Sequence, residues 1–396
     1  MPPLSFAALS VVTKEALSTP PGYAYDSHVA VSPATNEIFC CWCTKIGDVP
    51  EVVWRQGIPG EFSEPVAITD VDGRRSWNPS LAAGPDGRVH FAHMDQKIDG
   101  LQKEIYVKAW SDGSWGSETL LSLDDGWTGW DPDVAVYPDG RPAVCWFDHR
   151  FRVQHEILLR VGDGNGNWGP DVRMTKDDFW QYFPDIAIDS DSVVHLSYVD
   201  AREQLGDEDV DHYGVGKNLE TYYRTWNGTS LSPEVRITWT PLRSVASQIA
   251  VDNARKAHLI WLDESAKGWW RLYYTRIESG QPCDPIPVSN TNKRADLSAV
   301  ACLGSRTFMA YPEYDDPHSP STGMSRLYVR EVLPDGRLGT PLVLAVSGTN
   351  VHPRMAADPS RKMLWVIWME YLGEDETFTT GDSNIWLSGI KVDEQA

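Results

Sequence analysis

Short apolar runs separated by turn sequences recur along this chain, without the three-to-four-residue apolar spacing of amphipathic helices. One run repeats seven times, each copy starting 50 to 63 residues after the one before. A second run follows each copy after a turn such as GPDGR, a third follows a further loop, and most copies add a fourth after a hairpin sequence. The first runs are HVAV from His28, SLAA from Ser80, DVAV from Asp133, DIAI from Asp185, QIAV from Gln248, SAVA from Ser298 and RMAA from Arg354.

Seven units of four short strands predict an all-β fold, a seven-bladed β-propeller with four-stranded antiparallel blades. The seventh unit ends after its third strand, whereas the chain opens with AALSVVT, a fourth-type strand with no blade before it. We expect this N-terminal strand, about residues 5–13, to pair with the C-terminal blade and close the ring. Residues 1–396 are therefore expected to form one domain.

Loop lengths predict which face of the propeller carries the site. The first strand of a blade lines the axis, so the loop entering strand one and the loop leaving strand two open on the same face. The second-to-third loops are long in blades four, six and seven, and long loops in compact folds are usually functional. The opposite face carries tight PDG turns. We expect the site near the axis, on the long-loop face.

The ends of the second strands suggest catalytic residues. Six copies place an aromatic residue where the second blade has His93, so this residue either acts in function or is a buried structural histidine. Blades three and four place Arg150 and Arg202 at matching positions, with His149 beside the first. Each arginine either pairs with its own acid or faces a ligand. We predict His93, His149, Arg150 and Arg202 as catalytic residues.

Basic residues also gather where the first strands begin, among them Arg74, Arg75, Arg294 and His352. Such a mouth suits an anionic ligand, above all a carboxylate held by arginine. Indole rings in the loops that enter blades two to four would stack on sugar rings. We predict five substrate-binding residues: His28, Trp77, Asp133, Arg243 and Arg354.

The formal net charge of −21 disfavours nucleic acid and anionic membrane surfaces as partners. No apolar run approaches the ~18 residues of a membrane span. The expected partner is an acidic oligo- or polysaccharide, and the expected state is a monomer. We expect secretion, with the leader absent from this chain; the glycosylation sequence at Asn227 is weak support, and a cytoplasmic location stays open.

Cysteines and acidic loops offer little evidence for cross-links or metals. Four of the six cysteines lie in apolar runs and are expected as buried thiols, whereas Cys283 and Cys302 form the one plausible bridge. No cofactor is expected to be required. A structural Ca²⁺ could bind the loop 206–211, although a solvated acidic loop is the alternative, and a catalytic metal stays unknown. SLDDGWTGW resembles the Asp-box of sialidases but has an extra residue and falls between blades, which disfavours a sialidase.

Three kinds of chemistry fit such a face. In β-elimination on a uronate, arginines hold the carboxylate, one histidine removes the C5 proton, and the other histidine or a tyrosine protonates the leaving oxygen. In glycoside hydrolysis, two carboxylates act together. A lectin would only bind the sugar, but the mouth differs from blade to blade, which favours one site and hence an enzyme. The candidate carboxylates for hydrolysis are Asp133, Asp185, Asp200, Glu313 and Glu370.

The seven divergent blades, the starts WDPD and FPDIA and the ends FDHR and VDAR resemble the seven-bladed carbohydrate-active propellers. Among these, the chain is most similar to the L-rhamnose-α-1,4-D-glucuronate lyases, relatives of a propeller family first described as rhamnosidases. The resemblance covers the whole ring. It implies a polysaccharide lyase that removes terminal L-rhamnose from glucuronate in a glycan such as gum arabic and leaves an unsaturated uronate. It also implies catalysis by His, Tyr and Arg side chains.

Overall fold

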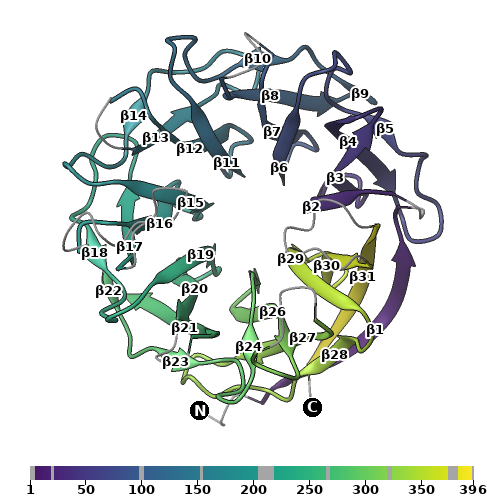
Figure 1. The fold of residues 1–396 in the computed structure, drawn as a ribbon, viewed down its shortest axis with the longest axis vertical. Coiled ribbons are helices and arrows are strands. Elements are labelled where there is room, and N and C mark those ends of the chain that lie inside the picture. Colours follow the sequence, from purple (N-terminus) through teal and green to yellow (C-terminus); the bar gives the residue numbers. More distant parts are fainter. Residues whose placement is uncertain are drawn as a thin grey trace.

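The computed structural model describes residues 5–18, 22–97, 102–151, 155–203, 218–264, 268–318, 323–372 and 382–394. All named elements in these ranges are β-strands, and they form seven antiparallel sheets. The sheets surround a central axis like the blades of a propeller (Figure 1). The expected seven-bladed all-β fold is confirmed.

Each blade runs from an innermost strand at the axis to short outer strands at the rim (Figure 1). The strands are, in blade one, β2 (Ala24–Val31), β3 (Ile38–Ile46), β4 (Val49–Gly57) and β5 (Val66–Ala67); in blade two, β6 (Ser76–Ala83), β7 (Val89–Asp95), β8 (Glu104–Ser111), β9 (Ser114–Trp115) and β10 (Thr119–Leu120); in blade three, β11 (Gly129–Val136), β12 (Pro142–Asp148), β13 (Glu156–Val161) and β14 (Val172–Arg173); in blade four, β15 (Gln181–Ile188), β16 (Val194–Asp200), β17 (Glu220–Trp226) and β18 (Val235–Arg236); in blade five, β19 (Ser244–Val251), β20 (Ala257–Glu264), β21 (Trp270–Glu278), β22 (Gln281–Pro282) and β23 (Ile286–Pro287); in blade six, β24 (Arg294–Ala295), β25 (Ala299–Leu303), β26 (Arg306–Tyr314), β27 (Ser325–Val332) and β28 (Leu342–Ala345); and in blade seven, β29 (Thr349–Asp358), β30 (Met363–Tyr371), β31 (Ser383–Glu394) and β1 (Ala7–Ala16).

The N-terminal strand closes the ring. β1 pairs antiparallel with β31 along its whole length and is the outermost strand of blade seven (Figure 1). From β1, Lys14 Nζ lies 4.9 Å from the ring centroid of Trp386, and the amide of Ala7 donates to Glu331 of blade six at 2.6 Å. The closing strand expected from sequence is confirmed, and it extends slightly beyond the expected residues.

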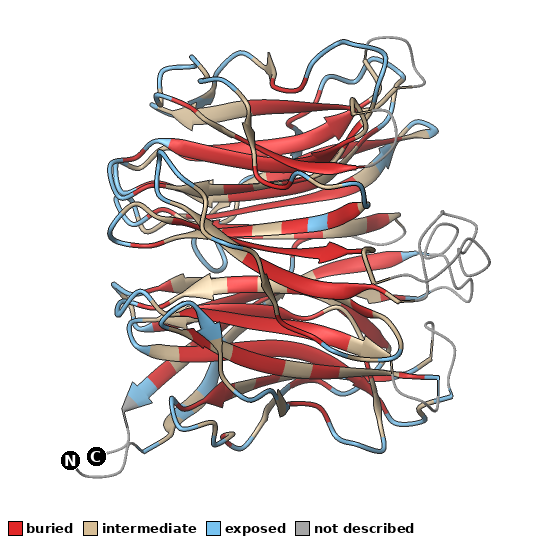
Figure 2. Cartoon of the chain, turned by 90° about the vertical axis from the view of Figure 1, so that its left-hand side faces the viewer, coloured by how far each residue is buried: buried red, intermediate tan, exposed pale blue. Residues whose placement is uncertain are grey.

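The hydrophobic core lies between neighbouring sheets, not within any one blade. One cluster joins Cys145 and Leu159 of blade three to Leu196 and Tyr198 of blade four, and similar clusters fill the other gaps. The second strands are therefore buried on both faces, as the red strands in the interior of Figure 2 show. A strand covered on both sides loses polar–apolar alternation, which explains the continuous apolar runs in the sequence.

Cations on the third strands link neighbouring blades. Lys108 donates to the carbonyl of Ile68 at 2.7 Å, in the outer part of the preceding blade. Arg160 makes the same contact with the Leu121 carbonyl at 2.7 Å. Because the cation and the acceptor belong to different sheets, these contacts set the spacing between blades on the outer side of the ring.

A shared backbone distortion shapes the axis. In six innermost strands the register shifts near the end where the strand begins. At each shift one non-glycine residue has φ between 47° and 53°. Each bulge adds one residue to the innermost strand and so changes the direction of the side chains beside it. Holding a non-glycine residue at positive φ costs about 1–3 kcal/mol. The six residues are Asp26, Asn78, Asp131, Phe183, Ala246 and His352.

Several sequence expectations concern cysteines, membranes and loops. Cys283 and Cys302 are free thiols, so the bridge between them that the sequence suggested is wrong, whereas the four cysteines expected to be buried are buried.

Among the described residues, no helix is long and apolar enough to cross a membrane. The candidate calcium loop 206–211 lies outside the described residues, as does much of the long loops of blades four, six and seven.

Buried glutamates begin three of the third strands, β8, β13 and β17, and Glu104 is the one whose proton equilibrium is most informative. Its side chain is buried, Oε2 accepts a hydrogen bond from Ser122, and Oε1 has no hydrogen-bond partner within the described chain. Burial raises the pKa of Glu104 to about 8, and the nearby Asp148 acts in the same direction. The folded protein therefore keeps a proton here that the unfolded chain releases.

We predict that Glu104→Gln removes part of the pH dependence of stability. Because the folded-state pKa is raised, the contribution of Glu104 is complete below the unfolded pKa near 4.5 and declines as pH rises towards 8. The variant should match the wild type in thermal unfolding at pH 4.5 and exceed it by about 1–2 kcal/mol at pH 8. A constant difference at both pH values would contradict a protonated Glu104.

Candidate active site

A cavity of about 450 Å³ opens on the propeller axis, where the bulged ends of the innermost strands converge. All seven blades contribute to its wall, so no single repeat contains the site. Its lining combines carboxylates, two histidines, one arginine and uncharged side chains: Asp26, Ser27, His28, Asn78, Pro79, Ser80, Asp131, Pro132, Asp133, Phe183, Pro184, Asp185, Val245, Ala246, Ser247, Gln248, Leu297, Ser298, His352 and Arg354.

Some of these side chains hold the ring together. Asp133 accepts hydrogen bonds from Ser80 Oγ at 2.8 Å and from the backbone amide of Ile186, in the next blade, at 2.9 Å. Asp185 likewise accepts from the amide of Ile249 at 2.7 Å. Burial raises the pKa of both carboxyls. Their bonds to the main chain give Asp133 a structural task in addition to its place on the cavity wall.

His28 makes the corresponding contact between blades one and two. Its Nδ1 atom accepts a hydrogen bond from the amide of Leu81 at 3.3 Å. Burial lowers the pKa of His28 to about 3, and the charge of Arg354 acts in the same direction. The imidazole is therefore neutral at physiological pH, which matches its role as an acceptor.

Arg354 is the cation inside the cavity. It lies on β29 and donates to the side-chain oxygen of Gln248 at 2.6 Å, while the amide nitrogen of Gln248 donates to the Ser298 carbonyl at 3.0 Å. Within the described chain, the Arg354 guanidinium forms no ion pair. An arginine positioned by a neutral amide retains its capacity to bind an anion.

Two bulge residues place carboxyl groups at the same cavity. Burial raises the pKa of Asp131 to about 6; the charge of Asp26 adds to this shift, whereas the hydrogen bond from Asn78 and the charge of Lys103 oppose it. Burial also raises the pKa of Asp26, against the charges of His352 and Arg354. Asp131 is thus a carboxyl group that gains and loses a proton near neutrality, a property typical of catalytic acids.

Lys103 lies outside the cavity lining but close enough to Asp131 for the two charges to act on each other. Its Nζ atom is 3.1 Å from the ring centroid of Trp130 and 5.7 Å from that of Trp77. Burial lowers the pKa of Lys103 to about 8, with Arg75 acting in the same direction and Asp131 opposing it. Arg75 is exposed, and its guanidinium has no hydrogen bond or ion pair in the described ranges. Two cations, Lys103 and Arg75, therefore lie close enough for their charges to act on each other.

An arc of stacked rings extends from Lys103 along blades three and four. The His149 ring lies 6.4 Å from Trp130 and 3.6 Å from His155, and His155 lies 4.6 Å from Trp180, all nearly parallel. Burial lowers the pKa of His149, and it lowers that of His155 to about 3. These rings stack on one another, and Lys103 lies over one face of Trp130. The indoles therefore have less free surface for sugar stacking than their sequence positions suggested.

His93 does not line the axial cavity. Its side chain is 0% exposed, it stacks on Phe91 at 4.8 Å, and Nε2 lies 3.5 Å from carboxylate oxygens of Asp95 and Glu118. This placement corresponds to the alternative of a buried histidine between blades. A catalytic role for His93 stays a prediction for which the geometry offers no support.

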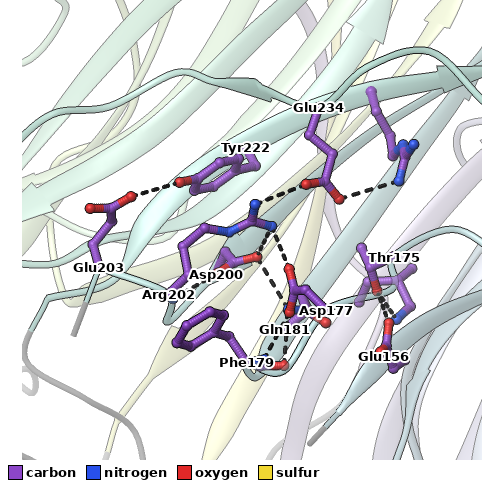
Figure 3. Close-up of polar contacts among 12 residues, drawn as sticks. Glu156, Thr175, Asp177, Phe179, Gln181, Asp200, Arg202, Glu203, Tyr222 and Glu234 are labelled. Atoms are coloured by element: carbon purple, nitrogen blue, oxygen red, sulfur yellow. Dashed lines mark hydrogen bonds and ion pairs between the residues drawn. The ribbon is translucent and has the colours of Figure 1, made fainter. Parts of the chain in front are cut away.

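Arg202 occupies a site of its own, away from the cavity lining (Figure 3). Its guanidinium lies 2.6 Å from Asp200, 2.7 Å from Asp177 and 2.9 Å from Glu234, and it covers the Tyr222 ring at 4.5 Å. Three carboxylates therefore surround one cation, which leaves little attraction for a substrate carboxylate.

Arg150 repeats this arrangement one blade earlier, and Arg243 is also paired. Arg150 lies 2.6 Å from Asp148 and 2.8 Å from Asp171. Arg243 pairs with Glu264 at 3.0 Å. Of the nine residues predicted from sequence, the structure thus brings His28, Asp133 and Arg354 together at the cavity, and the other six lie outside its lining. Trp77 lies near Lys103, His149 stacks on Trp130, and the remaining four are in packed or paired positions.

Sequence analysis did not single out Asp26, Asp131, Gln248 or Lys103. A signal for the first two was present, since each stands two residues before a copy of the repeated first run. No pattern marked Lys103, because its environment depends on the indoles of two different blades.

No protein-family model and no curated protein matches this chain. Among solved structures, the chain is similar to polysaccharide lyase Uly1 (TM-score 0.58, 11% identity, 95% of this chain and 91% of that chain). It is also similar to a protein of unknown function from Dyadobacter fermentans (TM-score 0.57, 11% identity, 97% of this chain and 99% of that chain). A third similar structure is the α-L-arabinanase of Penicillium chrysogenum (TM-score 0.52, 10% identity, 80% of this chain and 94% of that chain). At these identities the likeness shows the fold, and the neighbours include both a lyase and a glycoside hydrolase.

We predict that Arg202→Met acts mainly on stability. Removing the cation leaves three carboxylates partly buried and close together, which should lower the free energy of unfolding by about 2–3 kcal/mol. Arg75→Met, which removes an unpaired exposed cation, is the control and should leave the unfolding midpoint unchanged. Equal midpoints for both variants in thermal denaturation would refute the structural role of Arg202.

Proposed function

We propose that the protein is an enzyme that cleaves a uronate-bearing glycan at the axial cavity by β-elimination. The observation that carries this proposal is Arg354, a cation inside the cavity that is positioned by Gln248 and forms no ion pair with the described carboxylates. Elimination requires a neutralised substrate carboxylate, and arginine binds carboxylates with two parallel hydrogen bonds. The unpaired exposed cation, Arg75, attracts the same class of substrate.

The remaining groups supply the proton transfers. Lys103, with its pKa lowered to about 8, provides a fraction of free amine near neutrality and removes the C5 proton. The electron pair of that C–H bond forms the C4–C5 double bond as the C4–O bond breaks. Asp131, with its pKa raised to about 6, donates its proton to the departing oxygen. The products are an unsaturated uronate and the released sugar, and no cofactor takes part.

The substrate proposed here follows the resemblance in sequence: terminal L-rhamnose linked to glucuronate, as in gum arabic. The fold shared with a polysaccharide lyase agrees with this proposal but does not identify the sugar. A secreted monomer acting on plant or microbial glycan is the setting that we propose for this activity.

Glycoside hydrolysis is the second candidate, favoured by the pairing of Asp26 with Asp131. Both carboxyls lie on the cavity, and the charge of one raises the pKa of the other. Two carboxyls in different protonation states are the usual apparatus of glycosidases. The fold shared with an arabinanase is compatible with this alternative.

One assay separates the two reactions. The purified protein is incubated with gum arabic oligosaccharides, and the ultraviolet absorbance of the unsaturated uronate is recorded together with released reducing sugar. We expect absorbance and sugar to rise in equal amounts. Sugar without absorbance would show hydrolysis and overturn elimination, and neither signal would overturn enzymatic action on this substrate.

We predict that Arg354→Gln lowers kcat/KM for elimination at least about a hundredfold, because the carboxylate loses its charged partner. Arg243→Gln is the matched control, since Arg243 is paired outside the cavity, and it should retain activity. A similar loss in both variants would mean that folding, not carboxylate binding, was affected.

We predict that Lys103 sets the basic side of the reaction. Because Lys103 must be unprotonated and Asp131 protonated, the rate of the wild type should be highest between about pH 6 and 8 and should fall on either side. Lys103→Met should abolish elimination but still bind the substrate. A variant with an unchanged pH profile and rate would exclude Lys103 as the base.

A further inference from the structure

Three blades carry a histidine at the same position of the second strand: His90, His195 and His258. All three side chains are buried and face the following blade. Because the blades are structural repeats, the residues beside His195 and His258 indicate which hydrogen-bond partners His90 would be expected to have. The comparison is internal to this chain and independent of the axial cavity.

In blades four and five a tyrosine and an aspartate lie beside the histidine, although His258 Nε2 forms no hydrogen bond within the described chain. His195 Nδ1 lies 2.8 Å from the Tyr223 hydroxyl, and Nε2 lies 3.3 Å from Asp189 Oδ2. His258 repeats the pattern, with Tyr274 at 2.7 Å and Asp252 at 3.4 Å. A tyrosine from the third strand and an aspartate from the preceding turn therefore complete the design.

Blade two has lost both partners. Val107 stands where the tyrosine stands in the other two blades, and Gly84 stands where the aspartate does. His90 Nε2 is buried and has no hydrogen-bond partner in the described part of the chain, whereas the main chain of Gly140 forms a hydrogen bond with the His90 ring. A buried polar atom without a partner destabilises the fold. The missing phenol also leaves space.

A second cavity, of about 420 Å³, fills this space between blades two and three, on the face opposite the long loops. His90 and Val107 line it, together with Phe91 and Trp168 as apolar wall and Asn165 and Ser117 among its polar groups. The two cations on its wall are already paired with carboxylates: Lys108 lies 3.6 Å from Glu118, and Arg88 lies 3.5 Å from Asp86.

We propose that this cavity is a second binding site, for a neutral sugar residue, in which His90 Nε2 bonds a sugar hydroxyl in place of the aspartate present in the other two blades. A pyranose combines an apolar C–H face with hydroxyl edges, and the wall combines aromatic surface with amide and hydroxyl groups. The engaged cations favour a neutral ligand over a uronate. The site would hold a glycan on one face while the axial cavity acts on the other.

Restoring the missing side chain gives a sharp test. Val107→Tyr should fill the cavity with the side chain present in blades four and five and abolish sugar binding. Binding is measured by titration calorimetry with methyl α-L-rhamnopyranoside and methyl β-D-galactopyranoside. The titrations are made in the Arg354→Gln background, so that the axial cavity does not contribute. We expect a millimolar Kd for at least one glycoside, lost in Val107→Tyr.

Two histidine variants keep the test decisive if Val107→Tyr does not fold. His90→Ala should weaken the glycoside at least about tenfold, as expected for the loss of one buried hydrogen bond. His195→Ala, the matched control in blade four, should lower stability but leave binding unchanged.

Three outcomes would overturn the proposal. They are no binding of either glycoside at ~50 mM, binding that survives both Val107→Tyr and His90→Ala, and binding of phenol in the same titration without binding of a glycoside. None of these outcomes depends on whether the axial site performs elimination, so failure here and failure of the proposed function are distinguishable.

Discussion

The structure depends on hydrogen bonds that pass from a side chain of one blade to the backbone of the next at the axis. His28, Asp133 and Asp185 each accept the amide of the following innermost strand. A backbone amide at the inner edge of a sheet has no strand beyond it to pair with, so a side-chain acceptor from the neighbour satisfies it. The ring is thereby tied at its centre as well as closed at its rim.

This constraint also explains the chemistry of the cavity. Acceptors that bond an amide must be buried near other acceptors, and burial raises the pKa of every carboxyl in the group. The same bulges turn Asp26 and Asp131 towards the axis. The Asp131 carboxyl accepts from the Asn78 side chain but from no backbone amide of the described chain, and burial raises its pKa to about 6. Arg354 offsets part of the negative charge without pairing with any one described carboxylate. The bulged strand ends thus leave Asp131 and Arg354 available for the proposed reaction.

The repeat made the fold predictable from sequence, because strand length, turn residues and blade spacing are local properties that recur seven times. Ring closure followed from counting strands. The site was harder, since an arginine two residues after an aspartate looks the same whether it faces a ligand or acids from other strands. Arg202 meets Asp177 and Glu234, residues distant in the chain, and nothing in VDAR reveals them. Arg354 was recognised because its place at the start of the innermost strand points to the axis in every blade.

The functional significance of a position that departs from the repeat therefore depends on the residues around it. His93 departs from six aromatic siblings. It stacks on Phe91 and lies 3.5 Å from two acids, but neither ring nitrogen has a hydrogen-bond partner in the described chain, and it lines no cavity described above. His90 agrees with its siblings, and its partners are the exception, since Val107 and Gly84 replace the groups that complete the other two copies. An altered residue in intact surroundings can be compensated by packing. An intact residue in depleted surroundings leaves an unpaired nitrogen beside a cavity, which is the stronger indication of a missing ligand.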